Sequence, residues 1–165
     1  MEINYENLRE FETKMAVLAD ILEQKKESLQ AILIISENQE NLYLSGVDVS
    51  QRRDFVLEMG KEKQKCIDQT ITCDEMFQSI FDSISGIFNS HAQHHPKAVK
   101  RLQDGIDEVL KLDVKIRAQE EKTKVVAKEI WDKMSTTSVA KKTNTISKDY
   151  ILNKYKDNNR TRPKN

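Results

Sequence analysis

The sequence predicts an all-α fold: an elongated antiparallel bundle of three long helices over residues 1–134, followed by a disordered basic tail over residues 135–165. Three observations lead to this prediction. Only four glycines and two prolines interrupt 165 residues, so few positions can break a helix. Apolar residues recur in steps of three and four through three long stretches. The composition, 38% hydrophobic and 33% charged, is typical of a soluble helical protein.

The first predicted helix covers about residues 4–44. Its apolar seam is interrupted once, by Lys25, and otherwise consists of Leu8, Phe11, Met15, Leu18, Leu22, Leu29 and Ile32. Such spacing over several heptads indicates a helix packed against other helices. Ser45 and Gly46 supply the stop, and Asp48 followed by Gln51 resembles a capping box. We therefore expect the next helix to begin near Val49.

The second predicted helix covers about residues 49–90. Its apolar residues are Phe55, Val56, Met59, Cys66, Ile67 and Ile71, then Met76, Phe77, Ile80, Phe81, Ile84, Ile87 and Phe88. Thr72 followed by Glu75 is another possible capping box, so the sequence leaves open a continuous helix or a kink near 70–74. The second half is the densest apolar stretch of the chain, and we expect it to form the core at one end.

The third predicted helix covers about residues 97–134, after a connection from His91 to Pro96. Proline suits the first turn of a helix. Its seam consists of Val99, Leu102, Ile106, Val109, Ile116, Ala127, Ile130 and Met134. Asp113, Glu120 and Thr123 stand where this pattern calls for leucine. We expect looser or wetter packing there. Three segments of similar length with short connections favour an up-down-up arrangement.

Several classes of function lack support in the sequence. His91, His94 and His95 have no further ligand at metal-binding spacing, so we expect them to be solvent-exposed polar residues. No glycine-rich phosphate loop occurs. Acidic residues are accompanied by lysines at helical spacing, as on solvated faces. Cys66 and Cys73 are seven residues apart, too far for a disulfide on one helix. We expect no enzyme, no cofactor and no metal.

The expected compartment is the cytoplasm. No apolar run approaches the length of a membrane span, and Met1 to Glu10 is too polar for a signal peptide.

The tail holds eight basic residues against two acids, a net charge of +6, while the whole chain sums to zero. Its apolar residues are Ile146, Tyr150, Ile151, Leu152 and Tyr155. Spread charge and an acidic body disfavour nucleic acid, and membrane binding lacks a tight basic cluster. A segment that folds on binding another protein fits better, and a merely solvated C-terminus is the alternative.

Trp131, the single tryptophan, lies close to the point where the body gives way to the tail. It is either a core residue or, with Ile130 and Met134, part of a partner-binding face.

Two stretches resemble the FlgN family of flagellar type III export chaperones, in its clostridial form. The first is 18–44, which ends in Glu40-Asn41-Leu42-Tyr43-Leu44. The second is 53–81, with Lys61-Glu62-Lys63-Gln64-Lys65-Cys66-Ile67-Asp68 and then Asp74-Glu75-Met76-Phe77. The likeness in layout spans about residues 5–156.

The resemblance implies a cytoplasmic chaperone that binds the C-terminal helical regions of hook-filament junction proteins, keeps them unassembled and delivers them to the export gate. By position, the family's binding element falls on Ile130, Met134, Ile146, Tyr150, Ile151, Leu152 and Tyr155. Trp131 is added to this set because it lies beside Ile130 near the start of the tail, not because of the resemblance. A structural or scaffolding coiled coil without a dedicated client, either monomeric or a homodimer, is the main alternative. A helical protein associated with nucleic acid is a third hypothesis, and it requires binding that falls steeply with salt.

Overall fold

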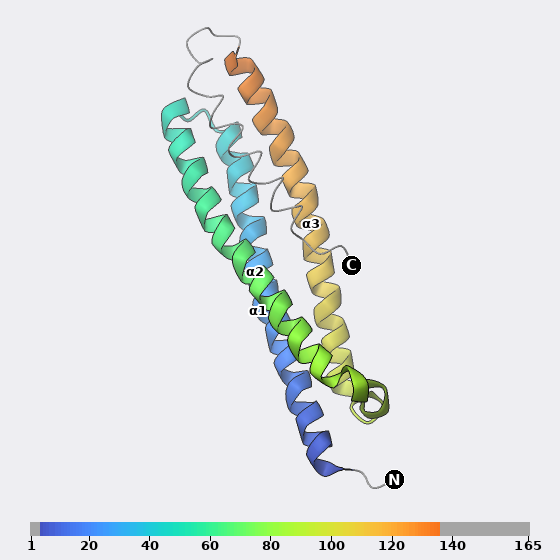
Figure 1. Ribbon diagram of the computed structural model, residues 1–165. Coiled ribbons are helices and arrows are strands. Elements are labelled where there is room, and N and C mark those ends of the chain that lie inside the picture. The colour runs from blue at the N-terminus through green and yellow to red at the C-terminus, as the bar shows by residue number, and fades with distance from the viewer. Residues whose placement is uncertain (1–3, 136–165) are drawn as a thin grey trace. The chain divides into compact units, whose positions relative to one another are not determined.

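The chain forms three long α-helices in the computed structural model, which describes residues 4–135. The helices are α1 (Tyr5–Leu44), α2 (Val49–Ala92) and α3 (Pro96–Ser135), labelled in Figure 1. Within residues 4–135, 94% of the chain is helical and there is no strand. The predicted all-α class and the three helices are therefore confirmed. Residues 136–165, nearly all of the predicted tail, lie outside the described residues.

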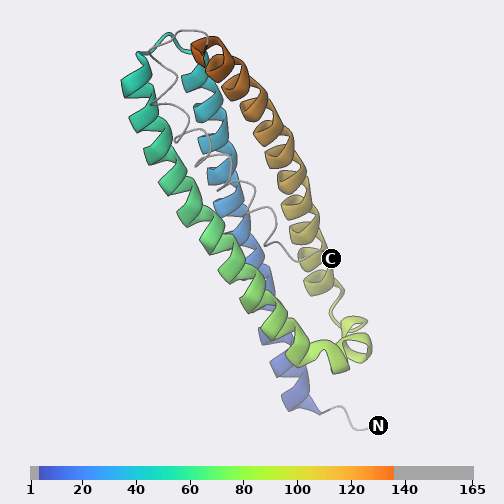
Figure 2. The ribbon, with the colours of Figure 1, turned by 45° about the horizontal axis from the view of Figure 1, so that its top comes forward.

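Local hydrogen bonds explain where the helices end and begin. The hydroxyl of Ser45 donates to the carbonyl oxygen of Leu42 at 2.7 Å, which closes the last turn of α1. The backbone N–H of Arg52 donates to the carbonyl oxygen of Asp48 at 2.8 Å, which opens α2. The connection of residues 93–95 leads into Pro96, the first residue of α3 (Figure 2). These boundaries lie within two residues of those predicted.

α2 runs without interruption through residues 70–74, so of the two predicted alternatives the continuous helix is correct. The hydroxyl of Thr70 donates to the carbonyl oxygen of Ile67 at 2.7 Å, and that of Thr72 to Asp68 at 3.1 Å. Each threonine thus bonds back into its own helix instead of starting a new one.

The described residues group into two compact units. Unit 1 consists of residues 4–35 and 63–118, and unit 2 of residues 36–62 and 119–135. The buried core of unit 1 takes residues from all three helices, namely Phe11, Met15, Leu18, Leu22, Leu29, Ile32, Ile84, Leu102, Val109 and Ile116. The dense apolar stretch of α2 packs against it with Phe77, Ile80, Phe81, Ile87 and Phe88. A core at one end of α2 was predicted from that stretch.

Side-chain contacts within unit 1 give the directions of the helices. Between α1 and α2 the pairs are Lys25 with Asp74 and Ser28 with Gln69, so residue numbers rise on one helix and fall on the other. Between α1 and α3 the pairs are Asp20 with Arg101 and Lys26 with Glu108, so both numbers rise together. In this unit α2 is therefore antiparallel to α1 and α3, as an up-down-up chain requires.

One predicted seam position of α3 is wrong. Ile106 is 36% exposed, because the buried face of α3 passes through its neighbour Gly105, which meets Leu22 of α1. In unit 1 the seam thus advances from Leu102 through Gly105 to Val109. A glycine carries no hydropathy signal, so the apolar pattern alone pointed to the wrong neighbour.

None of the helices in residues 4–135 carries a stretch long and apolar enough to cross a bilayer.

Candidate partner-binding surface

Two of the eight predicted binding residues have described side chains, and both lie near the end of α3. Ile130 and Trp131 are half-buried, and in unit 2 they pack against a small apolar cluster. Met134 belongs to α3, but its side chain is not among those that the structure describes. The remaining five predicted residues, Ile146, Tyr150, Ile151, Leu152 and Tyr155, lie outside the described residues. The structure thus brings Ile130 and Trp131 together on one surface.

The cluster under Ile130 and Trp131 is built where α1 turns into α2. Its three buried members are Tyr43 of α1, Val56 of α2 and Ala127 of α3, and we call these three residues the corner cluster. Half-buried side chains pack against it, namely Leu42, Val126, Ile130 and Trp131. Trp131 therefore takes part in packing and also keeps some surface in water. Both functions that the sequence suggested for this side chain are compatible with that position.

The turn between α1 and α2 is held by a compact set of hydrogen bonds. The guanidinium of Arg52 donates through Nη2 to the carbonyl oxygen of Val47 at 2.8 Å. The hydroxyl of Ser50 donates to Oδ2 of Asp48 at 3.1 Å. These two bonds join the turn to the first residues of α2, and the bond from Ser45 to Leu42 joins its other end to α1.

Unit 2 also contains a layer of buried and half-buried polar side chains. The hydroxyl of Ser36 donates to Oε1 of Glu120 at 2.6 Å, and the side-chain amide of Gln119 donates to Glu40. The hydroxyl of Thr123 contacts the carbonyl oxygen of Gln119 at 2.9 Å and that of Ser36 at 3.3 Å. We call these five residues the polar layer.

The polar layer lies where the sequence predicted a weakened seam. Thr123 is buried and its hydroxyl is hydrogen-bonded, so this position is packed instead of open to water. Ser36 and Gln119 are buried as well. Neither residue was predicted to be buried, because a lone serine or glutamine on a helix gives no apolar signal and is usually solvated.

Unit 2 also exposes large apolar side chains. Leu44 is 64% exposed, Phe55 52% and Val125 56%, one from each helix. Phe55 was counted among the apolar residues of α2 in the sequence, yet its neighbour Val56 takes the buried position. Single exposed apolar residues are common on folded proteins, so these three do not by themselves mark a binding surface.

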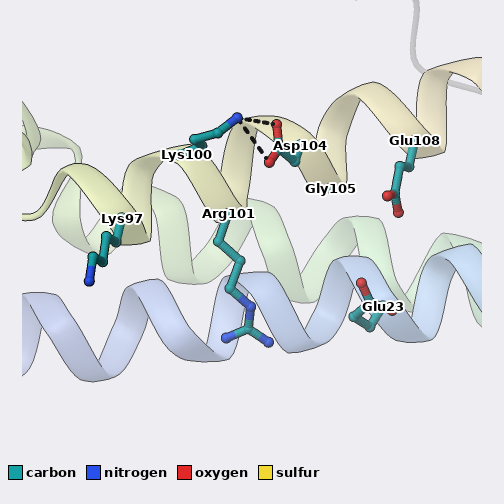
Figure 3. A pocket seen from close by; sticks show the side chains of 7 residues that line it. All are labelled: Glu23, Lys97, Lys100, Arg101, Asp104, Gly105 and Glu108. Carbon is teal, nitrogen blue, oxygen red and sulfur yellow. Dashed lines mark hydrogen bonds and ion pairs between the residues drawn. The ribbon is translucent and has the colours of Figure 1, made fainter.

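Unit 1 contains a charged hollow of about 390 Å³, shown in Figure 3. It is lined by Glu23, Lys97, Lys100, Arg101, Asp104, Gly105 and Glu108. Most of these charges are paired: Lys100 with Asp104 at 3.2 Å, Arg101 with Asp20 at 3.0 Å, and Glu108 with Lys26 at 2.7 Å. The hydrogen bond from Lys26 to Glu108 is the main reason that the pKa of Lys26 is raised. Two of these pairs, Arg101 with Asp20 and Glu108 with Lys26, link α1 to α3.

An aromatic group closes the core of unit 1 beside the α2–α3 connection. The centroid of the Phe11 ring lies 5.5 Å from the ring centroids of both His91 and His95 and 5.9 Å from that of Phe88. The prediction that these histidines are simply solvent-exposed is wrong for His91 and His95, which are half-buried against Phe11. Their aromatic faces cover an apolar ring that would otherwise face water.

Within residues 4–135, no group of three or more His, Cys, Asp or Glu is arranged to hold a metal ion. The two thiols are free, Cys73 buried and Cys66 half-buried. Burial, followed by the charge of Asp74, raises the pKa of Cys73, while Lys25 partly opposes this. A thiol with a raised pKa is mostly protonated at neutral pH and a poor nucleophile.

No protein-family model, no curated protein and no solved structure matches this chain. The functional assignment therefore depends on the residues themselves, and among the described residues the best-supported interaction surface is the one formed by Ile130, Trp131 and the corner cluster.

Proposed function

We propose that the chain is a FlgN-like export chaperone, which binds the C-terminal helical regions of flagellar hook-filament junction proteins. In this function it keeps its clients unassembled in the cytoplasm and delivers them to the export gate. The all-α fold is compatible with the proposal, and the sequence likeness over 18–44 and 53–81 supports it.

The observation that carries the proposal is the position of Ile130 and Trp131. Both are half-buried on the corner cluster near the end of α3, immediately before the tail that contains the apolar residues around Tyr150. An aromatic and an aliphatic side chain with part of their surface in water can anchor an amphipathic helix. The sequence predicts that this tail folds on binding, and the cost of ordering such a segment lowers the affinity, which suits a client that must be released.

The test compares the full chain with a truncation after Met134 for binding to a junction-protein C-terminal segment. Isothermal titration should show a loss of at least about tenfold in affinity, because ~1.4 kcal/mol corresponds to tenfold and the truncation removes five apolar anchors. A truncated protein with undiminished affinity would remove the tail from the binding site.

A second pair of variants tests the described surface. Trp131→Ala should weaken client binding, whereas Ile71→Ala, at an exposed apolar site of unit 1, should leave it unchanged. If the full chain binds no junction protein but forms stable dimers, the scaffolding coiled coil is the better description.

A further inference from the structure

The two units differ in how much apolar surface they bury. The core of unit 1 has ten buried members, whereas the corner cluster of unit 2 has three, and one of these is the small side chain of Ala127. Because stabilisation by burial grows with apolar area, helix segments in unit 2 are held less firmly than those in unit 1.

Within unit 2, the last part of α3, residues 119–135, is separate in sequence from residues 36–62. Residues 36–62 form one hairpin, fixed by the turn in which Arg52 bonds to Val47. By contrast, residues 119–135 touch the hairpin through the corner cluster and the polar layer. A hydrogen bond contributes only about 1 kcal/mol net, because water replaces it when the partners separate.

We infer that residues 119–135 of α3 detach locally from the α1–α2 hairpin, and that an amphipathic helix of the client then binds the hairpin in their place. The inference rests on the proposed function and names where on the chaperone the client docks. Detachment uncovers Tyr43 and Val56 on the hairpin and frees Ile130 and Trp131 on α3. The client is thus bound from two sides.

α3 itself shows what the incoming helix must look like. It places a small residue, Ala127, on the hairpin, with Ile130 three and Trp131 four positions later. A client helix needs the same order of small, aliphatic and aromatic side chains on one face. Residues 36–62 carry six acidic and three basic side chains, a net charge of −3. A basic polar face on the client therefore complements the hairpin.

Amide hydrogen exchange of the full chain tests the detachment. Amides of residues 119–135 should exchange faster than those of α1 and α2 in unit 1. Ala127→Asp places an unpaired charge in the corner cluster and should accelerate their exchange about tenfold or more. Val125→Asp, at an exposed position of the same segment, is the matched control and should change little.

A third variant tests the polar layer. Thr123→Val removes the buried hydroxyl that contacts the carbonyl oxygen of Ser36 and should accelerate exchange of residues 119–135 several-fold. The inference is wrong if all protected amides exchange in one step at equal rates. It is also wrong if Ala127→Asp removes protection in both units together.

The client part is tested with a synthetic peptide copying a junction-protein C-terminal helix. Trp131, the single tryptophan, exchanges the corner cluster for the peptide, so the wavelength of its emission maximum should change as the peptide is added. Ala127→Asp and Thr123→Val should both bind the peptide more tightly than the unmodified chain does, whereas Val125→Asp should bind it equally well. Unchanged affinity of the first two variants overturns the docking site while the chaperone function stands, whereas no peptide or client binding to the unmodified chain overturns the function as well.

Discussion

Gly105 of α3 and Leu22 of α1 are so close that a Cβ atom added to Gly105 would lie 3.0 Å from Cδ1 of Leu22. Such a separation is tighter than normal van der Waals contact, so the two helices meet in unit 1 at a point where only hydrogen fits without adjustment. The backbone of Gly105 does not need positive φ. The glycine is therefore required by packing, and larger side chains should be penalised in proportion to their size.

Substitution of glycine separates packing from helix propensity. Gly86→Ala meets no atom within 4 Å and should raise the free energy of unfolding by about 1 kcal/mol, because alanine favours the helix. At Gly105 the same gain is offset by the displaced Leu22, and Gly105→Leu should cost about 1–3 kcal/mol. Urea denaturation of Gly86→Ala, Gly105→Ala and Gly105→Leu measures the three changes in the free energy of unfolding. A Gly105→Leu protein as stable as the unmodified chain would contradict the close contact.

The phenylalanines of the two units should differ in their contribution to stability. Phe11 is fully buried between His91, His95 and Phe88, so Phe11→Ala should lower the free energy of unfolding by about 3–5 kcal/mol. Phe55 is half exposed, and Phe55→Ala should cost less than about 1 kcal/mol. The comparison uses the same denaturant titration. Equal losses would mean that Phe55 is covered in solution.

Thiol reactivity should distinguish the two cysteines. Cys73 is buried and its pKa is raised, chiefly by loss of hydration, so at pH 8 it should react with a disulfide reagent more slowly than Cys66. The Cys66→Ser and Cys73→Ser variants each leave one thiol for a direct comparison. Lys25→Met removes a charge that lowers the pKa of Cys73 and should slow that thiol further. Faster labelling of Cys73 than of Cys66 would contradict its burial.

The same raised pKa predicts how stability depends on pH. Because the folded state keeps the Cys73 thiol protonated, its contribution is fully present below the ordinary thiol pKa of 9.0. Above that pH the unfolded chain loses the proton first, so stability should fall as pH rises further. The Cys73→Ala variant should show a smaller fall between pH 8 and pH 10 in thermal unfolding. An unchanged slope would exclude Cys73 as a cause.

Local signals sufficed for the helix boundaries, but contacts between distant residues did not follow from them. Gly46 and Pro96 act on the backbone next to them, so the ends they predict are correct. Lys25 looked misplaced on an apolar seam, and the reason is Asp74, 49 positions away, which it contacts at 2.5 Å. Thr72 resembled the start of a helix, because a sequence pattern does not show whether its hydroxyl bonds forward or back.

The candidate surface was predicted only in part, because its contacts also join residues that are far apart in the sequence. The end position and apolar character of Ile130 and Trp131 are visible in the sequence. Their packing partners, Tyr43 and Val56, come from other helices and depend on the tertiary arrangement. The buried Ser36 is recognisable only after Glu120 and Thr123 have been placed beside it.

The polar layer has a consequence for how the chain assembles. A purely apolar seam on long helices can slide by one heptad, seven residues, and still bury its side chains. Hydrogen bonds between buried side chains are met in one alignment only, because any shift leaves Ser36 and Gln119 without partners. The polar layer thus stabilises one alignment of the helices over the shifted ones. Ser36→Leu combined with Gln119→Leu should therefore give a protein with several helix alignments, visible as broadened amide resonances.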